Sequence, residues 1–242
     1  MIFLFTDFGL EGPYVGQVKS VLWRTAPGVP VFDLLADAPA CRPKEAAYLL
    51  AALVQECPPE SLFLAVVDPG VGGERPPVAL RLDERWFVGP GNGLFEIVSR
   101  RARLRESFLI DFQPTRLSAS FHGRDLFAPV AGMLAAGQAP ASIGLGPGTE
   151  ARHSEWPDDL PAVIYRDRYG NLLTGLRAEG VEQEHALRIN GHAVGWAPTF
   201  SAVAPGKAFW YGNSSGLVEI AVNCGDAAAV LGAEIGSEVE FI

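Results

Sequence analysis

The first 136 residues alternate short apolar runs with segments of helix-like spacing. Ile2–Phe5 and Leu62–Val67 are apolar runs of strand length, and each leads into a polar loop that contains glycine. Between them, Lys44–Cys57 is rich in alanine and leucine, and a pair of prolines ends it. Short buried strands that alternate with helices are typical of a mostly parallel sheet covered on both faces. We therefore predict an α/β domain over residues 1–145.

The pattern changes after this region. Residues 137–161 hold four glycines and four prolines, a composition typical of a linker between domains, and we place the linker at 146–161. Beyond it, short strand-like runs are separated by turn sequences. Asn190-Gly191 is the clearest of these, because this dipeptide favours a tight hairpin. Strands at this spacing predict a small antiparallel β-barrel domain over residues 162–242.

Composition and charge argue against several classes of protein. The formal net charge of −9 disfavours a surface that binds nucleic acid. The longest apolar run, Ala46–Val54, is far shorter than the ~20 residues that cross a bilayer. The first residues lack the basic segment of a signal peptide, and the three cysteines form no C-x-x-C pair. We expect a cytoplasmic protein without a membrane or nucleic-acid partner.

Polar, glycine-rich clusters follow three of the predicted strands. Asp7 follows the first strand, Asp68 follows the strand at 62–67, and Gly89–Gly93 follows a later one. In open α/β sheets, ligands bind outside the carboxyl ends of the strands. A single aspartate in a loop more often forms a turn or caps a helix. Three such clusters on one predicted edge nevertheless favour a ligand site.

One of these clusters and a later segment of the chain contain side chains that suit catalysis. Asp68 and Arg75 lie seven residues apart across a Gly-Gly turn, close enough to meet in a tight loop. Such a pair would either lock the loop or act on a ligand, and the pattern leaves both interpretations open. His122 precedes a predicted helix, where a lone histidine is more often structural than part of a site. The chain has no P-loop motif and no H-x-x-x-H pair, so phosphate-loop and zinc chemistry are not expected.

Six motifs occur in order along the chain: Thr6–Gly9, Val66–Gly72, Phe87–Pro90 with Asn92-Gly93, Phe121–Asp125, Asp167 with Gly170-Asn171, and Asn213–Gly216 with Glu219–Ala221. With these motifs the chain resembles the S-adenosyl-L-methionine hydroxide adenosyltransferase family, whose hydrolases are related to the bacterial fluorinase and chlorinase. The resemblance extends from residue 1 to residue 242. The chain departs from the family pattern at Gly91, where the family has an aspartate, and at Tyr169, where it has a phenylalanine.

The resemblance implies hydrolysis of S-adenosyl-L-methionine at C5′ of its ribose, which gives adenosine and L-methionine. In the family, an aspartate, an arginine and a histidine hold the attacking water, and the matching residues here are Asp68, Arg75 and His122. A guanidinium beside a water lowers the pKa of that water, and a carboxylate or an imidazole can take its proton. The sequence leaves open which of the two takes it. The sulfonium is already an activated leaving group, so no metal and no organic cofactor is implied.

The resemblance also implies a set of substrate-binding residues. Asp7 matches the carboxylate that receives the two ribose hydroxyls. Asp167 and Asn171 match positions near the methionine amino group. The other candidates are Asn92 in the glycine-rich loop, Ser214 and Glu219 in the segment that faces methionine and adenine, Val222 beside the purine, and Phe200, which can stack on a ring where the family usually has tyrosine.

Two other functions remain open at this point. A halogenase of the same fold would place halide on C5′, but such enzymes lack the Asp–Arg–His set and carry an extra loop in the N-terminal domain. A sensor would bind S-adenosylmethionine or adenosine without turnover. The resemblance further implies a homotrimer, in which the N-terminal domain of one subunit and the C-terminal domain of its neighbour share the site.

Overall fold

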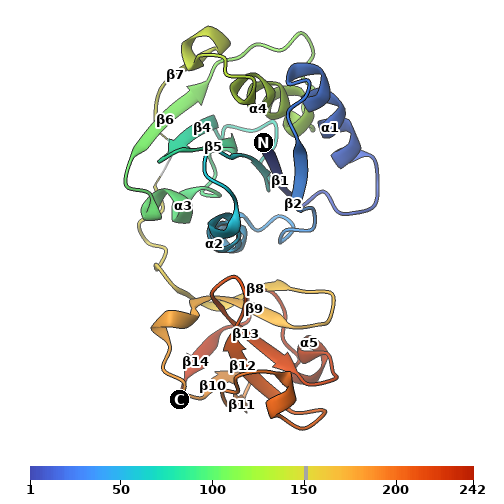
Figure 1. Ribbon diagram of the computed structural model, residues 1–242, viewed down its shortest axis with the longest axis vertical. Coiled ribbons are helices and arrows are strands. Elements are labelled where there is room, and N and C mark those ends of the chain that lie inside the picture. The colour runs from blue at the N-terminus through green and yellow to red at the C-terminus, as the bar shows by residue number, and fades with distance from the viewer. Residues whose placement is uncertain (150–151) are drawn as a thin grey trace. The chain divides into compact units, whose positions relative to one another are not determined.

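The structure is a computed structural model that describes residues 1–149 and 152–242 (Figure 1). The chain divides into two compact units. The first comprises Met1–Ala47 and Cys57–His153, and the second comprises Tyr48–Glu56 and Ser154–Ile242. The linker predicted at 146–161 includes residues 150 and 151, which lie outside the described residues. The predicted domain boundaries therefore stay a prediction.

The first unit contains a seven-stranded sheet in the order β2-β1-β3-β5-β4-β6-β7 (Figure 1). Its strands are β1 (Ile2–Thr6), β2 (Val31–Leu35), β3 (Leu62–Val66), β4 (Pro77–Leu82), β5 (Arg85–Pro90), β6 (Arg105–Ile110) and β7 (Leu145–Pro147). The strands from β2 to β5 in this order pair in parallel, which confirms the predicted α/β class. The remaining pairs are antiparallel. β4 and β5 form a hairpin because only Asp83 and Glu84 connect them, with Asp83 at a φ of 52°.

The register of β1 and β3 sets the edge at which the first two polar clusters lie. Thr6 is paired with Val66, and the Asp7 N–H donates to the Val66 carbonyl at 3.3 Å. Asp7 and Asp68 therefore leave the sheet from neighbouring strands at the same, carboxyl edge. The predicted meeting of these two clusters at one edge of the sheet is confirmed.

The helices in the chain up to residue 149 are α1 (Tyr14–Thr25), α2 (Pro43–Leu53), α3 (Glu96–Arg101) and α4 (Ala128–Ala135), with a π-helical turn at Gly123–Phe127 and 3-10 turns at Val54–Glu56 and Pro140–Ile143. Val18, Val21 and Leu22 of α1 are buried, which is the i, i+3, i+4 spacing of an apolar face. α1 packs against α4 where Gly132 meets Thr25. A Cβ at Gly132 would lie 1.9 Å from Thr25 Oγ1, so only glycine permits this approach.

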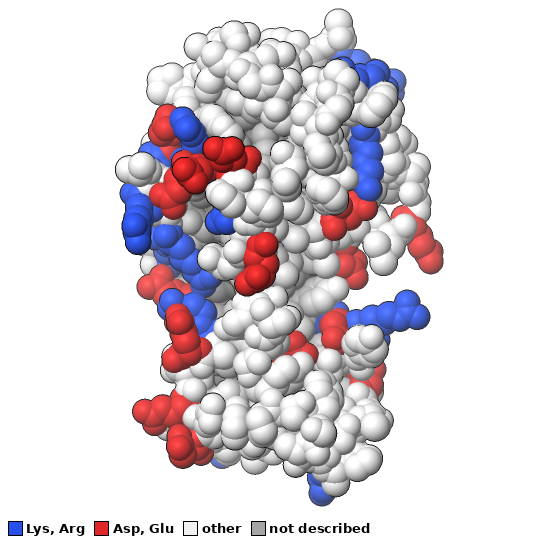
Figure 2. All heavy atoms as spheres, viewed as in Figure 1, with Lys and Arg blue, Asp and Glu red and all other residues white. Residues whose placement is uncertain are grey.

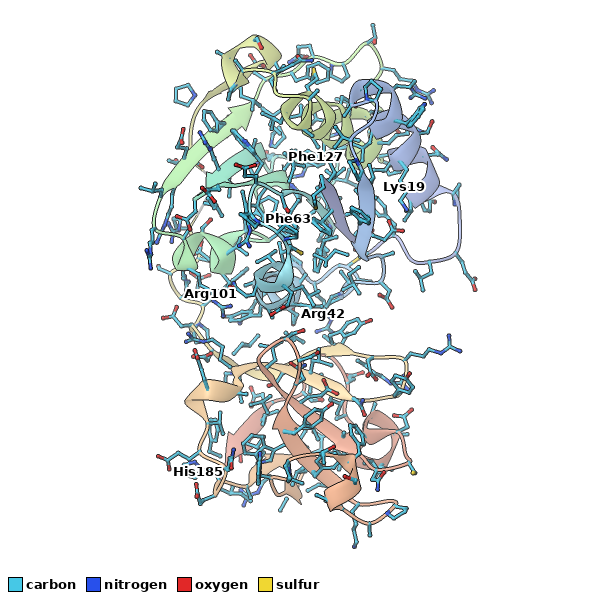
Figure 3. All side chains as sticks on the ribbon, in the orientation of Figure 1. Lys19, Arg42, Phe63, Arg101, Phe127 and His185 are labelled. Carbon is cyan, nitrogen blue, oxygen red and sulfur yellow. The ribbon has the colours of Figure 1, made fainter. Side chains whose placement is uncertain are left out.

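Side chains on the two faces of the sheet form separate layers of the core. Phe3, Phe63 and Phe87 come from paired positions on β1, β3 and β5, and their rings stack at centroid distances of 5.5 and 4.9 Å. Leu4 points to the other face, because successive side chains of a strand alternate, and belongs to a cluster with Phe127. Figure 3 shows Phe63 and Phe127 inside this unit.

The second unit is antiparallel, as the sequence predicts. Its strands are β8 (Leu160–Arg166), β9 (Leu172–Arg177), β10 (Leu187–Ile189), β11 (His192–Val194), β12 (Ala208–Gly212), β13 (Leu217–Val222) and β14 (Val239–Phe241), joined by 3-10 turns at Ala178–Gly180 and Phe200–Ala202 and the short α5 (Ala227–Leu231). They form two sheets, β12-β13-β9-β8 and β11-β10-β14, around a core that contains Trp210. Asn190 and Gly191 form the predicted tight turn, both with positive φ.

A buried carboxylate holds the last residues of the first unit against α3. Glu96 is fully buried; its Oε1 accepts from Arg100 Nε at 2.8 Å, and its Oε2 accepts from Arg152 Nε at 3.1 Å and from the His153 N–H at 3.2 Å. Burial acts to raise the pKa of Glu96, but these hydrogen bonds outweigh it and hold the pKa below its ordinary value.

We expect Glu96→Ala to lower the free energy of unfolding by about 2–4 kcal/mol at pH 7, because it leaves the arginines without their buried acceptor. The stabilisation by Glu96 is present above the pKa of an unfolded carboxyl group and is lost as the pH falls through the lower pKa of the folded state. Urea unfolding measures both effects. Glu106→Ala, which removes an exposed partner of Arg81, is the control and should cost less than about 1 kcal/mol. Equal costs for the two variants would contradict this account.

The face of the molecule seen in Figure 2 carries acidic and basic side chains interspersed among uncharged ones. Among the described residues, no helix combines the length and the apolar character that crossing a membrane requires.

Candidate active site

Asp68 and Arg75 form a bidentate ion pair in the loop that follows β3. Arg75 Nε lies 3.0 Å from both carboxylate oxygens of Asp68, and Arg75 Nη2 lies 2.5 Å from Oδ2. Only 4% of the Asp68 side chain and 10% of the Arg75 side chain are exposed. Two parallel charge-assisted hydrogen bonds hold the planes of both groups in one orientation. The loop geometry that the sequence suggests is therefore present.

His122 joins this pair from a segment 47 residues further along the chain. Its Nδ1 lies 2.9 Å from Arg75 Nη2. A guanidinium can only donate, so His122 Nδ1 is the acceptor and the ring proton resides on Nε2. Burial lowers the pKa of His122, and the positive charge of Arg75 lowers it further. The imidazole is consequently neutral at neutral pH.

A glycine lets the two loops approach closely enough for this contact. Gly72 has a φ of +80°, and a Cβ there would lie 2.5 Å from the Ala119 carbonyl oxygen. Any other residue would push the Asp68–Arg75 loop away from the segment that leads to His122. Gly72 therefore permits the contact between the Asp68–Arg75 loop and the segment that carries His122.

Asn92 has a role in the structure that the sequence does not reveal. Its Nδ2 donates to the Val67 carbonyl at 2.9 Å, and its Oδ1 accepts from the Leu94 N–H at 3.3 Å. Both ends of its amide thereby tie the loop after β5 to the residue before Asp68. Its predicted contact with substrate stays a prediction.

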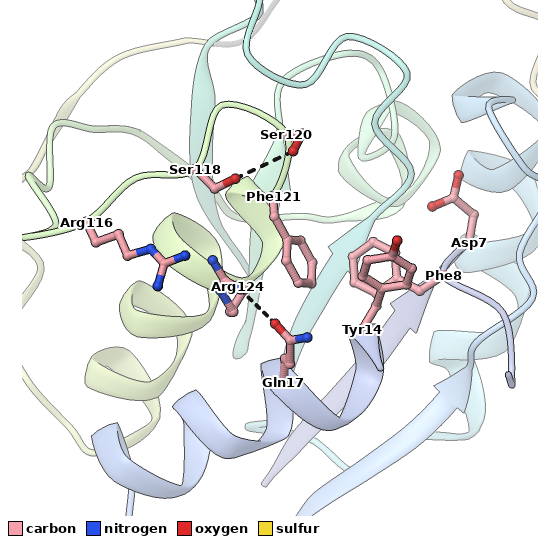
Figure 4. A pocket seen from close by; sticks show the side chains of 9 residues that line it. All are labelled: Asp7, Phe8, Tyr14, Gln17, Arg116, Ser118, Ser120, Phe121 and Arg124. Atoms are coloured by element: carbon pink, nitrogen blue, oxygen red, sulfur yellow. Dashed lines mark hydrogen bonds between the residues drawn. The ribbon is translucent and has the colours of Figure 1, made fainter. Parts of the chain in front are cut away.

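Asp7 borders a pocket of about 530 Å³ in the first unit. Its Oδ2 accepts from the Cys41 N–H at 3.1 Å. Burial raises the pKa of Asp7, and the nearby charge of Asp68 adds to the effect. The pocket is lined by Asp7, Phe8, Tyr14, Gln17, Arg116, Ser118, Ser120, Phe121 and Arg124 (Figure 4).

The aromatic wall of this pocket was missed by the sequence reasoning. Phe8, Tyr14 and Phe121 contact one another with centroid distances between 5.4 and 6.2 Å. Arg124 lies over the Phe121 ring and donates to Gln17 at 2.7 Å (Figure 4). Phe8 and Phe121 lie within the motifs Thr6–Gly9 and Phe121–Asp125, beside the candidate residues Asp7 and His122, but nothing in the sequence indicated that their rings form a pocket wall.

A second pocket, of about 680 Å³, lies within the second unit. It collects most of the predicted C-terminal site residues, and its lining is Asp167, Tyr169, Asn171, Phe200, Tyr211, Glu219, Val222, Cys224 and Gly225. Ser214 is exposed in the turn between β12 and β13 and does not line this pocket. Tyr211 lines it although no sequence motif pointed to that residue.

The carboxylate of Asp167 organises a turn beside this pocket. Oδ1 accepts from the N–H groups of Tyr169 and Asn171, both at 2.8 Å, and Oδ2 accepts from Asn171 Nδ2 at 3.0 Å. Much of its hydrogen-bonding capacity is thus used within the turn. The predicted contacts of Asp167 and Asn171 with the methionine amino group stay a prediction.

Models of two domains match this chain. The SAM hydroxide adenosyltransferase N-terminal domain matches residues 2–144, and the C-terminal domain of the same family matches residues 161–240. A protein of Thermus thermophilus named (R)-S-adenosyl-L-methionine hydrolase is 38% identical, with 100% of this chain and 99% of that protein covered. A protein of the same name from Salinispora tropica is 34% identical, with 97% and 94% covered.

Solved structures agree with these matches. An uncharacterized conserved protein from Thermotoga maritima superposes with a TM-score of 0.89 at 29% identity, over 100% of this chain and 99% of that one. A conserved hypothetical protein from Thermus thermophilus superposes with a TM-score of 0.80 at 36% identity and the same coverage. Both domain models match in order and together span most of the sequence, so this chain belongs to the SAM hydroxide adenosyltransferase family.

Proposed function

We propose that this protein hydrolyses S-adenosyl-L-methionine to adenosine and L-methionine. Its family and the names of its relatives support this activity. The names of the relatives specify the (R) configuration at sulfur, and we extend that preference to this chain. The observation that carries the chemistry is the part-buried cluster in which Arg75 donates to both Asp68 and His122.

The reaction needs a water aimed at C5′ and little else. The water oxygen forms a bond to C5′ while the C5′–S bond breaks. The electron pair of the C5′–S bond goes to the sulfonium sulfur. Methionine leaves as an uncharged thioether, so its departure needs no general acid. The proposed reaction therefore requires no metal and no organic cofactor. Arg75 favours the hydroxide-like form of the water through its positive charge.

The hydrogen bonds of the cluster favour Asp68 as the group that takes the proton. His122 Nδ1 is occupied by Arg75, so its Nε2–H can only donate and would orient the water oxygen. Asp68 Oδ1 accepts a side-chain hydrogen bond from Arg75 Nε, which leaves it a further lone pair for a proton. On this assignment His122 orients the water and Asp68 acts as the base.

The rate is expected to fall on the acid side of neutrality. A protonated His122 would direct an Nδ1–H at the Arg75 guanidinium, and the cluster would separate. Because the pKa of His122 is lowered, kcat/KM should stay level near pH 7 and decline only at a pH below the ordinary pKa of histidine. A pH profile of kcat/KM tests this, with His122→Gln as the variant that should lose this decline. A rate that rises as the pH falls through 6.5 would exclude a neutral His122.

We also propose a cytoplasmic homotrimer with the site shared between subunits. Asp7 lines a pocket in the first unit, whereas Asp167, Asn171 and Glu219 line a separate pocket in the second, and this division supports a site completed by two chains. All three cysteines are free thiols, which suits a reducing compartment.

Product analysis tests the proposed reaction. The purified protein is incubated with the separated (R) and (S) diastereomers of S-adenosyl-L-methionine in chloride buffer, and the products are resolved chromatographically. Equal amounts of adenosine and methionine are expected, and the (R) substrate should react faster. 5′-Chloro-5′-deoxyadenosine would indicate a halogenase instead, and binding without any product would indicate a sensor.

A further inference from the structure

Thr6, the last residue of β1, is a buried polar side chain at the carboxyl edge of the first sheet. Only 2% of the residue is exposed, and its Oγ1 has no hydrogen-bond partner within residues 1–149 and 152–242. An unpaired buried hydroxyl destabilises a folded protein, whereas a valine of nearly the same shape would fill the position without this cost. The cost is explained if the hydroxyl serves a ligand instead of the fold.

The Thr6 side chain lies on the face of the sheet that carries Arg75. Residues two apart along a strand, and residues paired on neighbouring strands, share a face. Leu4 precedes Thr6 by two residues and Val66 is paired with it, and both belong to the core cluster that contains Phe127. The Arg75 guanidinium lies over the Phe127 ring, 5.4 Å from its centroid. Thr6 therefore faces the same side of the sheet as Arg75.

The segment that carries His122 also packs against the end of β1. Phe8, two residues after Thr6, meets the ring of Phe121 edge to face at a centroid distance of 5.6 Å (Figure 4). A Cβ at Gly123 would lie 2.9 Å from Cζ of Phe8. The residues on both sides of His122 are thus in contact with the chain just beyond Thr6.

An attacking water has four hydrogen-bonding directions, and the proposed mechanism uses three of them. One lone pair forms the bond to C5′, and the other accepts from His122 Nε2–H, since His122 Nδ1 is occupied. One O–H is directed at Asp68, which takes its proton. The second O–H needs an acceptor, because a water free to rotate loses the alignment of its lone pair with the C5′–S bond.

We propose that Thr6 Oγ1 accepts this second O–H and so aligns the attacking water with C5′. The inference deepens the proposed function and rests on it. The water oxygen bonds to C5′, the electron pair of the C5′–S bond goes to sulfur, one proton goes to Asp68, and the other proton stays on the oxygen. The retained proton becomes that of the 5′-hydroxyl group of adenosine, so Thr6 contacts this group in the product as well.

Thr6→Val tests the proposal, because it removes the hydroxyl and keeps the shape of the side chain. It should lower kcat for S-adenosyl-L-methionine by roughly 10- to 100-fold and change KM by less than about threefold. The same variant should raise the thermal unfolding temperature by roughly 2–6 °C, since it removes an unpaired buried hydroxyl. Thr6→Ser keeps the oxygen and should stay within about fivefold of the wild-type kcat.

Equilibrium binding to the full-length protein supplies a readout that does not depend on turnover. The ligands are adenosine and 5′-deoxyadenosine, which lacks the 5′-oxygen. Wild-type protein should bind adenosine more tightly, and Thr6→Val should reduce this preference by roughly three- to tenfold. The affinity for 5′-deoxyadenosine should stay near the wild-type value in Thr6→Val, because that ligand has no group for the hydroxyl to bind.

Thr174→Val is the matched control in the second unit. Thr174 is fully buried; its Oγ1 donates to the Val218 carbonyl at 2.9 Å and accepts from the Leu176 N–H at 3.3 Å. Loss of these bonds should lower the unfolding temperature and leave both kcat and the preference for adenosine unchanged.

The outcomes separate this inference from the proposed function. If the wild-type protein hydrolyses S-adenosyl-L-methionine, an unchanged kcat or an unchanged preference for adenosine in Thr6→Val would overturn the inference and leave the function standing. If the preference falls in Thr6→Val but the wild-type protein forms no adenosine, the result would contradict the proposed function alone.

Discussion

Replacing Arg75 by alanine is expected to lower kcat by roughly 100- to 1,000-fold while KM changes by less than about tenfold. Arg75 contacts both Asp68 and His122. Its charge stabilises the hydroxide-like water that develops in the transition state, and the bound substrate gains little from it. Arg75→Lys keeps the charge but loses the planar fork, so it should recover only part of the rate. Steady-state kinetics with S-adenosyl-L-methionine measure both parameters.

The matched control is Arg177→Ala in the second unit. Arg177 makes a similar bidentate contact with Asp159, at 2.7 and 2.6 Å, and lies outside the second pocket. It should leave kcat near the wild-type value. If the Asp68–Arg75 pair served only to lock its loop, Arg75→Ala would lower the thermal unfolding temperature and leave kcat of the folded protein intact. That result would return the pair to a structural role.

Co-expression of two inactive variants is expected to restore activity. Asp7→Ala changes a residue that lines the pocket of the first unit, and Glu219→Ala changes a residue that lines the pocket of the second. If each site takes its first unit from one subunit and its second unit from a neighbour, random mixing in trimers leaves about one site in four intact. Mixed trimers should therefore regain about a quarter of the wild-type kcat per site, although each variant alone is nearly inactive.

Asp7→Ala co-expressed with Arg75→Ala is the control for this experiment. Both changes lie in the first unit, so every site in every mixed trimer keeps one defect and no activity should return. Light scattering of the same preparations measures the assembly. A monomer with full activity, or no recovery in the Asp7→Ala and Glu219→Ala mixture, would contradict the shared site.

The fold was predictable where local sequence decides it. The apolar run at Ile2–Phe5 is observed as β1, and Asn190-Gly191 forms the expected hairpin turn. The helix predicted after His122 is present, but it begins as a π-helical turn at Gly123–Phe127 that leads directly into α4. The antiparallel half of the first sheet was not predictable, since Asp83-Glu84 is not one of the turn sequences that signal a hairpin.

The contacts of the candidate site were likewise predictable only where they join residues that are near in sequence. Asp68 and Arg75 are near in sequence, and their loop pairing follows from spacing. Contact with His122 depends on Gly72 packing against Ala119, a tertiary fact that no local pattern records. Tyr211 reaches Glu219 only through the register of β12 and β13, which is set by a turn and by burial. The motif residues could therefore be identified from the sequence, whereas the residues that they contact could be identified only from the structure.

Hydrolysis in oxygen-18 water tests the central claim most directly. If water activated by the Asp68–Arg75–His122 cluster attacks C5′, the adenosine formed carries one oxygen-18 atom in its 5′-hydroxyl group and the methionine carries none. Mass spectrometry of the two products measures this. Unlabelled adenosine, or label found in methionine, would contradict attack at C5′.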